Sequence, residues 1–430
     1  MGDLKEFEVT EVTASGFATN SGQTPVLFLT FFFFIDMGNL TKYSKLKGGP
    51  HMSLSEKERD RRYTELRKRM KEMSVDILLV FGDTGDWGLR YGNLRYLTNH
   101  KVIFGNSALV FPIDQEPVMF MFSSLQANWA KQLSWIKDVR FSSNLISDII
   151  NTLKSLQPKG RRLGIASLAS LPFSWYQMLN QEFPSIDIIE MSPVIEEMRY
   201  IKGEEEVGLA GRAAQLADKG FDSVLKGLKP GMTEFEALAL LELPMREGGG
   251  DDFFDLICSG PFGPGIKMVP FAITGRREPS RTIEVGDSIL SEITPRYGGY
   301  WAQLVRIVSI GRQNKLLANY NRVARAAIEA TTKHFQPGTK LADALCEAKK
   351  VIQSEGFELR LPMGHLCGLN LVEDRISPES EDVLQPGMVL ILHPIVGGAG
   401  DTQMFVGETY VITSEGYRRL NQATDELINI

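Results

Sequence analysis

Residues 286–310 read GDSILSEITPRYGGYWAQLVRIVSI, the most informative stretch of the chain. Two runs of strand-forming residues lie on either side of the glycine pair Gly298-Gly299. This pattern is typical of a β-hairpin.

Helical segments flank this hairpin on both sides. The charged stretch 192–206 predicts the start of a long helix that continues to Leu228, and Pro230-Gly231 ends it. A second helix is predicted at 233–249, a helical hairpin at about 314–355, and short strands after it. The order helix, helix, strands, helix, helix, strands indicates two similar halves.

An α/β pattern precedes these elements. A capping serine, Ser55, and Glu58 three residues later begin a predicted helix, and the apolar run at 75–82 predicts a buried strand after it. Further strands are predicted at 107–113, 117–123, 161–167 and 186–192, with a helix at 125–133. The 430 residues are too many for one typical domain. We therefore predict an α/β (α+β) chain with an extension at 1–52, an N-terminal domain with a mixed sheet at 53–190 and a second domain at 191–430.

The extension contains the apolar run Val26–Ile35, VLFLTFFFFI. It has about half the length needed to cross a bilayer as a helix, and four of the five charged residues before it are acidic, unlike the basic start of a secretory signal. Two interpretations stay open. In the first, the run is a membrane anchor or a strand exchanged within a dimer. In the second, residues 1–52 are a dispensable extension. Residues 48–52, GGPHM, resemble an engineered junction, so His51 is set aside.

Charge and cysteine content narrow the class of protein. The net charge of −6 disfavours nucleic acid as a partner, because binding phosphates requires a basic face. Cys258, Cys346 and Cys367 have scattered spacings that fit neither a disulfide framework nor a Cys-x-x-Cys metal site. We expect a cytoplasmic protein that acts on a small molecule, without nucleic-acid or membrane partners.

Several short phrases occur in a characteristic order along the chain. They are EEMRYIK (196–202), GDSIL (286–290), GY (299–300), GH (364–365), GMV (387–389) and GE (407–408). With them, residues 53–430 resemble the creatinase, aminopeptidase P and prolidase family. The resemblance implies a creatinase-like N-terminal domain, a pita-bread catalytic domain of two αββ halves around a curved sheet, and a homodimer.

The resemblance also implies a set of site residues. Metal-dependent members of the family hold two divalent ions with two Asp, one His and two Glu. At these positions the chain has Glu292, Gln303, His365, His393 and Glu408. Two are unchanged and three are substituted, and all five are expected to converge on one cavity.

The substitutions change the charge of this set. A two-metal centre needs bridging carboxylates, and too few remain. His365, His393 and Glu408, with the Gln303 amide oxygen as a fourth donor, suit one Zn²⁺, Fe²⁺ or Mn²⁺. Glu292 would then be free to act as a general acid or base. Two alternatives are a metal-free acid–base pocket, as in creatinase-like members, and an inert remnant that binds no metal.

Two histidines of the family's peptidases are missing. One of them would stand seven residues after His365, where this chain has Val372. The next residue, Glu373, matches the family's glutamate and is a catalytic candidate. The other position falls near Gly275 or Arg276. We therefore expect Xaa-Pro dipeptides to be poor substrates, and creatine as well, since its catalytic groups are also replaced.

The candidate substrate-binding residues are Arg276, Arg306, Tyr300 and Trp87. Arginine binds carboxylate or phosphate through two parallel hydrogen bonds, and Trp87 lies in a loop of the N-terminal domain. These groups predict a small anionic substrate with an apolar part. The alternative is that the arginines are solvated surface groups.

Four functions stay open. The main prediction is an enzyme that hydrolyses a C–N bond of a small polar metabolite. Two His and one carboxylate also form the ligand set of mononuclear iron oxygenases, and family relatives include lyases. An Xaa-Pro peptidase and a non-catalytic binding protein are the remaining alternatives, because fold alone does not determine function.

Overall fold

The computed structural model describes residues 54–82, 92–156, 162–168, 171–263, 272–273, 281–312, 314–400 and 402–430. Within the chain, residues 48–430 form one compact unit. The predictions for Val26–Ile35, His51, Trp87 and Arg276 lie outside the described residues. No helix in the described ranges is both long enough and apolar enough to cross a membrane.

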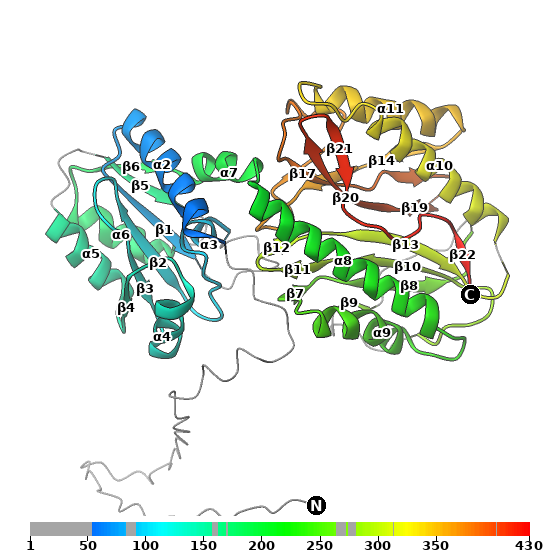
Figure 1. The fold of residues 1–430 in the computed structure, drawn as a ribbon, viewed down its shortest axis with the longest axis horizontal. Helices are drawn as coiled ribbons and strands as arrows, with labels where there is room; N and C mark the ends of the chain where they lie inside the picture. The colour runs from blue at the N-terminus through cyan, green and yellow to red at the C-terminus, as the bar shows by residue number, and fades with distance from the viewer. Residues whose placement is uncertain are drawn as a thin grey trace, which may run out of the picture. The chain divides into compact units, whose positions relative to one another are not determined.

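The first part of the described chain is a six-stranded mixed sheet with helices (Figure 1). Its strands are β1 (Ile77–Gly82), β2 (Ser107–Pro112), β3 (Val118–Met121), β4 (Asp138–Phe141), β5 (Arg162–Ala166) and β6 (Asp187–Glu190), in the order β4-β3-β2-β1-β5-β6. The helices are α2 (Glu56–Glu72), α3 (Gly92–Thr98), α4 (Ser124–Leu133), α5 (Leu145–Leu156), α6 (Phe173–Glu182) and α7 (Ser192–Tyr200). Antiparallel pairs (β1–β2, β2–β3) and parallel pairs (β1–β5, β3–β4, β5–β6) occur together, which confirms the predicted mixed sheet.

The predicted cap of the first helix is present. The Ser55 hydroxyl accepts a hydrogen bond from the Glu58 backbone N–H at 3.3 Å, directly before α2. The prediction of one continuous helix from 192 to 228 is wrong. Helix α7 ends at Tyr200, and Ile201 forms a β-bridge with Met388 before α8 begins. This tertiary pairing takes the backbone out of the helical conformation, which the charged local sequence does not reveal.

Two helix pairs and three sheets form the second part. The helices are α8 (Glu204–Gly227), α9 (Glu234–Glu247), α10 (Lys315–Thr332) and α11 (Leu341–Ser354). The largest sheet follows the order β16-β15-β17-β20-β13-β10-β8-β9, with β21 on β20 and β22 on β13; its strands are β8 (Leu256–Gly260), β9 (Ala272–Ile273), β10 (Ser288–Ile293), β13 (Leu304–Ser309), β15 (Gly364–Leu366), β16 (Asp374–Arg375), β17 (Val389–Leu392), β20 (Gly407–Thr413), β21 (Gly416–Arg419) and β22 (Ile428–Asn429). Two three-stranded sheets contain β7 (Asp252–Phe253), β11 (Pro295–Tyr297), β12 (Tyr300–Trp301), β14 (Glu358–Arg360), β18 (Ile395–Gly397) and β19 (Gln403–Phe405). The predicted order of helix pairs and strands is confirmed.

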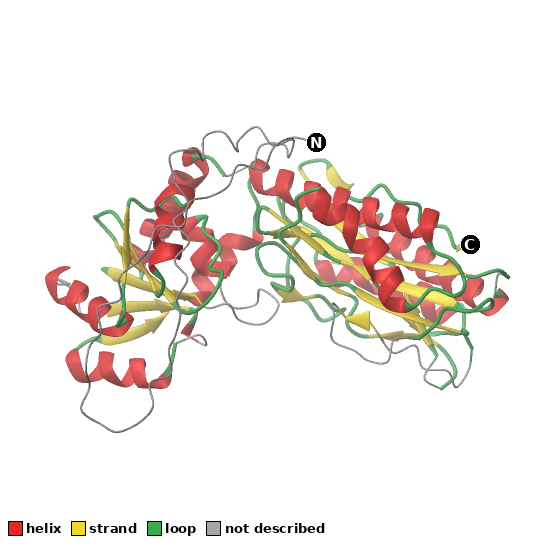
Figure 2. Cartoon of the chain, turned by 90° about the horizontal axis from the view of Figure 1, so that it is seen from below, coloured by secondary structure: helices red, strands yellow, loops and turns green. Residues whose placement is uncertain are grey.

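The two faces of the ten-stranded sheet differ. On one face, Ile293 and Leu304 share a core with α8 and α9, while Leu392 shares a core with α10 and α11. Figure 2 shows helices lying along the strands in this part of the chain. Successive side chains of a strand point to opposite faces. Neighbours of these apolar residues in the chain, including Glu292 and His393, therefore lie on the face away from the helices.

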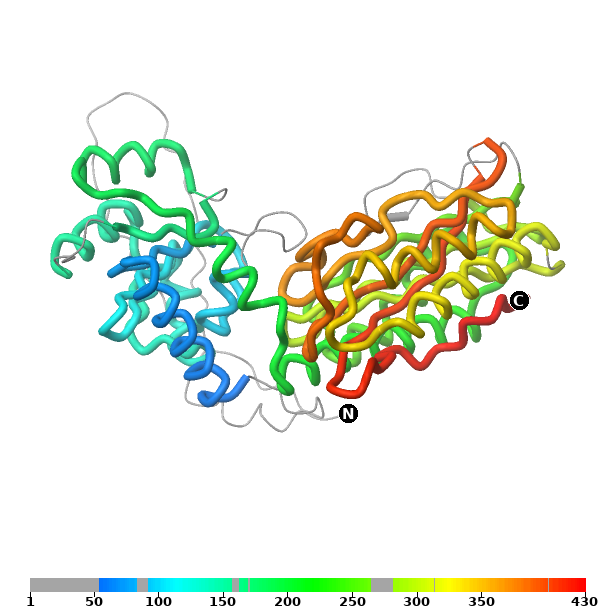
Figure 3. The backbone as a smooth tube through the Cα atoms, turned by 90° about the horizontal axis from the view of Figure 1, so that it is seen from above, coloured from blue at the N-terminus to red at the C-terminus, as the bar shows by residue number. Residues whose placement is uncertain are grey.

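The end of the chain fixes the strand at the centre of this sheet. After β21, Asn421 and Gln422 bond to Ala214 and Asp218 of α8, and Figure 3 shows this C-terminal run alongside the helix. The Asn421 side-chain oxygen also accepts a hydrogen bond from the Thr409 backbone N–H at 3.0 Å. The contacts hold the first residues of β20 in register.

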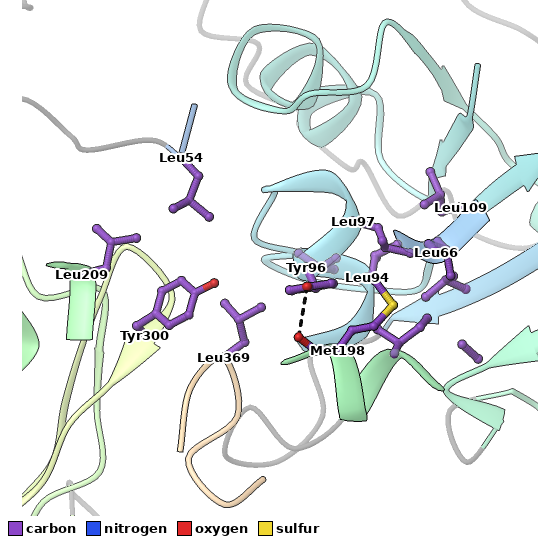
Figure 4. Packing of buried hydrophobic residues seen from close by; sticks show 14 of the residues in the cluster. Leu54, Leu66, Leu94, Tyr96, Leu97, Leu109, Met198, Leu209, Tyr300 and Leu369 are labelled. Atoms are coloured by element: carbon purple, nitrogen blue, oxygen red, sulfur yellow. Dashed lines mark hydrogen bonds between the residues drawn. The ribbon is translucent and has the colours of Figure 1, made fainter. Parts of the chain in front are cut away.

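One apolar cluster contains residues from both parts of the described chain. Tyr96 of α3 and Leu209 of α8 belong to it together with Tyr300 of β12 (Figure 4). The Tyr96 hydroxyl donates to the carbonyl of Met198 at 3.3 Å. Residues far apart in the sequence therefore share one core, and Tyr300 is part of that core.

Candidate active site

Strand pairing brings Glu292 and His393 to one face of the ten-stranded sheet. Glu292 of β10 lies opposite Val305 of β13, and Val305 lies opposite Gly407 of β20. Leu392 of β17 lies opposite Glu408, so the next residue, His393, falls beside Gly407. Strands are about 4.8 Å apart. Glu292 and His393 therefore stand at the two ends of a row whose centre is formed by Gly407 and Val305.

His365 lies beside His393 on the same face. The ring centroids of the two histidines are 5.6 Å apart in an edge-to-face arrangement. Both residues are buried, with 6% and 7% of their surface exposed. Burial lowers the pKa of His365 to about 3, with the neighbouring His393 adding to this shift, and burial lowers the pKa of His393 to about 4. Both imidazoles are therefore neutral near pH 7.

Glu292 forms the acidic end of the row. One of its carboxylate oxygens accepts a hydrogen bond from the Gln303 side-chain N–H at 2.7 Å. Burial raises the pKa of Glu292 to about 7, against the opposing effect of this hydrogen bond. A carboxyl group with a pKa near 7 can both accept and donate a proton under physiological conditions.

Gln303 is held by several contacts and has one polar atom without a partner. Only 1% of its surface is exposed, and its side-chain N–H groups also reach Thr294 Oγ1 at 3.2 Å. Its backbone N–H donates to Thr409 Oγ1 at 2.8 Å. The Gln303 Oε1 atom and the His393 Nδ1 atom are buried and have no hydrogen-bond partner. Such atoms are costly unless something completes their bonds.

Glu408 does not join this group. Its carboxylate accepts hydrogen bonds from Arg306, from Arg419 at 2.7 Å and from the Tyr410 hydroxyl at 2.6 Å. It shares its register row with Leu304 and Leu392, on the face covered by helices. The prediction that Glu408 is a metal ligand beside His365 and His393 is therefore wrong.

The residue of β20 on the face of His393 is Gly407. A Cβ atom added to Gly407 would lie 2.4 Å from the Cβ of His393 and 2.4 Å from the carbonyl oxygen of Leu392. Such distances are far below van der Waals contact. No liganding side chain fits at position 407 while His393 keeps its place.

The divalent ions implied by the family resemblance do not fit these residues. Across the described ranges, no three or more His, Cys, Asp or Glu side chains come together as a metal site. In the described register row of this face, the carboxylate is that of Glu292, which accepts a hydrogen bond from Gln303. The bridging carboxylates that a two-metal centre needs are missing. The predicted site for a single ion, whether Zn²⁺, Fe²⁺ or Mn²⁺, lacks its carboxylate ligand, because Glu408 lies on the other face. The predicted ligation by His365, His393, Gln303 and Glu408 is therefore not supported.

Two predicted substrate-binding residues have other roles. Arg306 is 2% exposed and donates to the carbonyl oxygens of Thr424 at 2.7 Å and Gly407 at 2.9 Å, besides its ion pair with Glu408. It points to the helix-covered face and ties β13 to β20. Tyr300 is buried in the core shared by the two parts of the chain. Both predictions are wrong, because the polar groups of these two side chains already have partners inside the protein.

Glu373 is held in a buried ion-pair cluster. Its two carboxylate oxygens lie 2.8 Å from Arg199 and 2.6 Å from Lys202. Burial would raise the pKa of Glu373, but the two cations lower it overall. The carboxylate stays ionised and fixes the segment after β15 to the residues around α7. The prediction of a catalytic role for Glu373 is therefore not supported.

Asp255 is a residue near the site that the sequence predictions missed. It is fully buried and comes directly before Leu256, which lies opposite Glu292. Its carboxylate accepts a hydrogen bond from the Thr294 backbone N–H at 2.7 Å. Burial raises its pKa to about 8. An acidic residue inside the apolar run FFDLIC was the available sequence signal.

Two family models match this chain. The model of "Metallopeptidase family M24" matches residues 209–414, and that of "Creatinase/Prolidase N-terminal domain" matches residues 62–201. An uncharacterized peptidase of Bacillus subtilis is 26% identical over 370 residues, covering 85% of this chain and 98% of the relative. An Xaa-Pro dipeptidase of Pyrococcus horikoshii is 24% identical over 363 residues, covering 84% and 96%.

Solved structures give the same result for the fold. The X-Pro aminopeptidase from Thermotoga maritima matches with a TM-score of 0.74 and 20% identity, covering 86% of this chain and 99% of that chain. The prolidase from Pyrococcus horikoshii matches with a TM-score of 0.73 and 22% identity, covering 86% and 100%.

Proposed function

Because the chain belongs to metallopeptidase family M24, a family of hydrolases, and carries a creatinase/prolidase N-terminal domain before it, we propose that it hydrolyses a C–N bond of a small polar substrate through Glu292 without a two-metal centre. The family, the pita-bread fold and the assignment to hydrolases, all predicted from the sequence, are confirmed. The substrate and the proton-transfer residues are the proposal.

The observation that carries the proposal is the environment of Glu292. Its pKa of about 7 and its hydrogen bond to Gln303 suit a group that takes a proton and returns it. Ionised Glu292 accepts a proton from the attacking water, whose oxygen bonds to the carbon of the C–N bond. The protonated carboxyl group then donates that proton to the leaving nitrogen as the bond breaks.

The two histidines have a binding role in this proposal. His365 and His393 are neutral near pH 7, so they offer hydrogen bonds to a polar substrate without adding positive charge. Val305 and Gly407, which carry no polar side chain, lie between His393 and Glu292 along the row. Arg306 cannot bind the predicted anionic substrate at this face, since its side chain points to the other face of the sheet. Arg276 stays a prediction.

Hydrolysis should not depend on a divalent ion. We expect that treatment with EDTA followed by gel filtration leaves the rate of amine release unchanged within about twofold, because the donor set lacks bridging carboxylates. Thermal unfolding should also show no shift when Zn²⁺, Mn²⁺ or Fe²⁺ is added, since only ligands that bind the folded state raise its stability. Loss of activity on chelation, restored by one of these ions, would contradict the proposal.

A second candidate function is cleavage of Xaa-Pro dipeptides, which the names of relatives from two Pyrococcus species favour. The missing carboxylates argue against it, so Ala-Pro and Gly-Pro should be poor substrates with or without Mn²⁺. The measurement compares the rate of proline release from these dipeptides with the rate of amine release from a set of other small amides. If the wild type cleaved Ala-Pro in the presence of Mn²⁺ and Glu292→Gln abolished this cleavage, Xaa-Pro peptidase would be the better assignment.

A cytoplasmic location and a homodimer stay predictions.

A further inference from the structure

A polar cavity lies on the helix-covered side of the ten-stranded sheet, away from the face of Glu292 and His393. Its volume is about 640 Å³, within the range of about 300–1,000 Å³ that is usual for small-molecule sites. The sheet contributes Glu408 and Tyr410 of β20, which are both buried. Helix α10 and residues 425–427 near the C-terminus form the other walls. This cavity, here called the α10 cavity, is therefore separate from the candidate active site.

One stripe of helix α10 lines the α10 cavity. Ala318, Asn321, Arg325, Ile328 and Thr332 follow one another at spacings of three or four residues, so they lie on one side of the helix. Asn321 and Thr332 are buried although they are polar. The side of a helix that faces a sheet is normally apolar. The polar side chains of this stripe therefore indicate a polar ligand.

Asn321 is the buried group that most needs a partner. Its side chain is 4% exposed and lines the cavity, and its amide has no hydrogen-bond partner among the described residues. Buried polar groups in proteins nearly always have such a partner. An Asn amide both donates and accepts hydrogen bonds. The cavity wall thus offers a donor and an acceptor at one buried position.

Two charged groups of the α10 cavity are also available to a ligand. Arg325 Nε lies 3.0 Å from Asp425 Oδ2, but the terminal amino groups of Arg325 have no hydrogen-bond partner in the part of the chain that the structure describes. The exposed carboxylate of Glu426 has no partner there either. The cavity therefore has one cation and one anion that can still form bonds.

The remaining charges around the cavity are matched inside the protein. The ion pairs are Arg322 with Glu355 at 2.6 Å, Glu329 with Lys333 at 2.9 Å, and Glu408 with Arg306 and Arg419. A ligand with a positive and a negative group of its own would leave this balance undisturbed.

We propose that the α10 cavity binds a zwitterionic α-amino acid with a small apolar side chain. The terminal N–H groups of Arg325 bind the ligand's carboxylate through parallel hydrogen bonds. Glu426 binds its ammonium group, and the Asn321 amide donates to the carboxylate or accepts from the ammonium group. The apolar side chain of the ligand packs against Ile328 and Leu427, which line the same cavity.

Ligands with a net charge match these walls less well. A phosphate or a dicarboxylate would meet the carboxylates that line the cavity, which are those of Glu329, Glu408, Asp425 and Glu426. Like charges brought together cost binding free energy. A simple amine would leave the terminal N–H groups of Arg325 without a partner. Only the zwitterion satisfies the available cation, anion and amide at once.

Calorimetric titration of the full chain with L-leucine tests the proposal. We expect saturable binding with a Kd below about 1 mM. Isocaproate lacks the ammonium group of leucine, and isoamylamine lacks its carboxylate. Each should bind at least about tenfold more weakly, because one charged group of the cavity loses its partner. Absence of saturable binding of L-leucine up to about 10 mM, or equal binding of either analogue, would overturn the proposal.

Two variants locate the ligand. Glu426→Gln changes an exposed side chain, so it should weaken L-leucine binding at least about tenfold without loss of folding. Glu415→Gln is the matched control, because Glu415 is exposed in the turn between β20 and β21, and it should bind like the wild type. Asn321→Leu removes the buried amide and should weaken binding to a similar extent.

A third variant separates the α10 cavity from the candidate active site. Glu292 lies on the other face of the sheet, so Glu292→Gln should bind L-leucine with the wild-type affinity. Loss of binding in this variant would place the ligand at the active site and overturn the proposal. Full affinity in Glu426→Gln, or in a folded Asn321→Leu variant, would do the same.

Discussion

Glu292→Gln is expected to lower kcat by about 10²–10⁴-fold, the usual contribution of a positioned proton carrier. The substituted amide keeps the size of the side chain and can still meet Gln303, but it cannot take up a proton. In the wild type, kcat/KM should rise with pH through about 7, because the ionised form of Glu292 is the base. This limb of the profile should vanish in the variant. Amine release measured from pH 5 to 9 checks both statements.

A surface variant controls for the chemical change itself. Glu284→Gln makes the same substitution at a side chain that is 74% exposed, and it should leave kcat unchanged. If Glu292→Gln kept more than half of the wild-type rate, Glu292 would not be the proton carrier and the proposed mechanism would be wrong.

Stability gives a second measurement of the same carboxyl group. The folded pKa of Glu292, about 7, lies above the ordinary value of 4.5. Its contribution to stability is therefore fully present below pH 4.5 and is lost as the pH rises through 7. Glu292→Gln lacks this loss, so above pH 7 it should be more stable than the wild type by about 1–3 kcal/mol. An inactive variant with increased stability at high pH would separate a functional role from damage to the fold.

Arg62→Met is expected to lower the free energy of unfolding by about 3–5 kcal/mol, since it removes one partner of a buried charge cluster. Arg62 has no exposed surface. Its guanidinium donates to Glu58 at 2.8 Å, lies 3.0 Å from Glu206 and donates to the Tyr300 hydroxyl at 3.1 Å. It also stacks on Tyr96, 4.0 Å from the ring centroid. Without it, two buried carboxylates would share Arg61 alone.

Urea unfolding followed by tryptophan fluorescence measures this loss. Arg322→Met is the matched control, because Arg322 pairs with Glu355 at the surface and its side chain is 53% exposed. The control should cost about 0–1 kcal/mol. A loss below 1 kcal/mol for Arg62→Met would show that the cluster does not hold the two parts of the chain together.

The pH dependence of the Arg62 effect has a definite sign. Burial raises the pKa of Glu58, but the hydrogen bond from Arg61 and the charge of Arg62 lower it to about 2. The resulting stabilisation is present above pH 4.5 and is lost as the pH falls towards 2. The difference between wild type and Arg62→Met should therefore shrink when unfolding is measured at pH 3 instead of pH 7.

Local chemistry in the sequence determined much of the fold. The Ser55 cap, the helix pairs and most strands depend on residues close together in the chain, and the structure has them where they were predicted. The glycine-rich stretch at 286–310 also predicted the hairpin in which β10 pairs with β13, and the side chains of Glu292 and Gln303 form a 2.7 Å hydrogen bond there. Short phrases in a fixed order identified the family without any knowledge of contacts.

The composition of the site depended on tertiary structure. Glu408 and Gly407 are neighbours in the chain, but a strand turns successive side chains to opposite faces, so a shift of one residue replaces a carboxylate by a glycine. Arg306, Tyr300 and Glu373 have suitable chemistry in the sequence, yet partners from distant elements bind each of them. A sequence lists the polar groups. Only the pairing of strands and the burial of partners decide which of them face a substrate, because both depend on residues far apart in the chain.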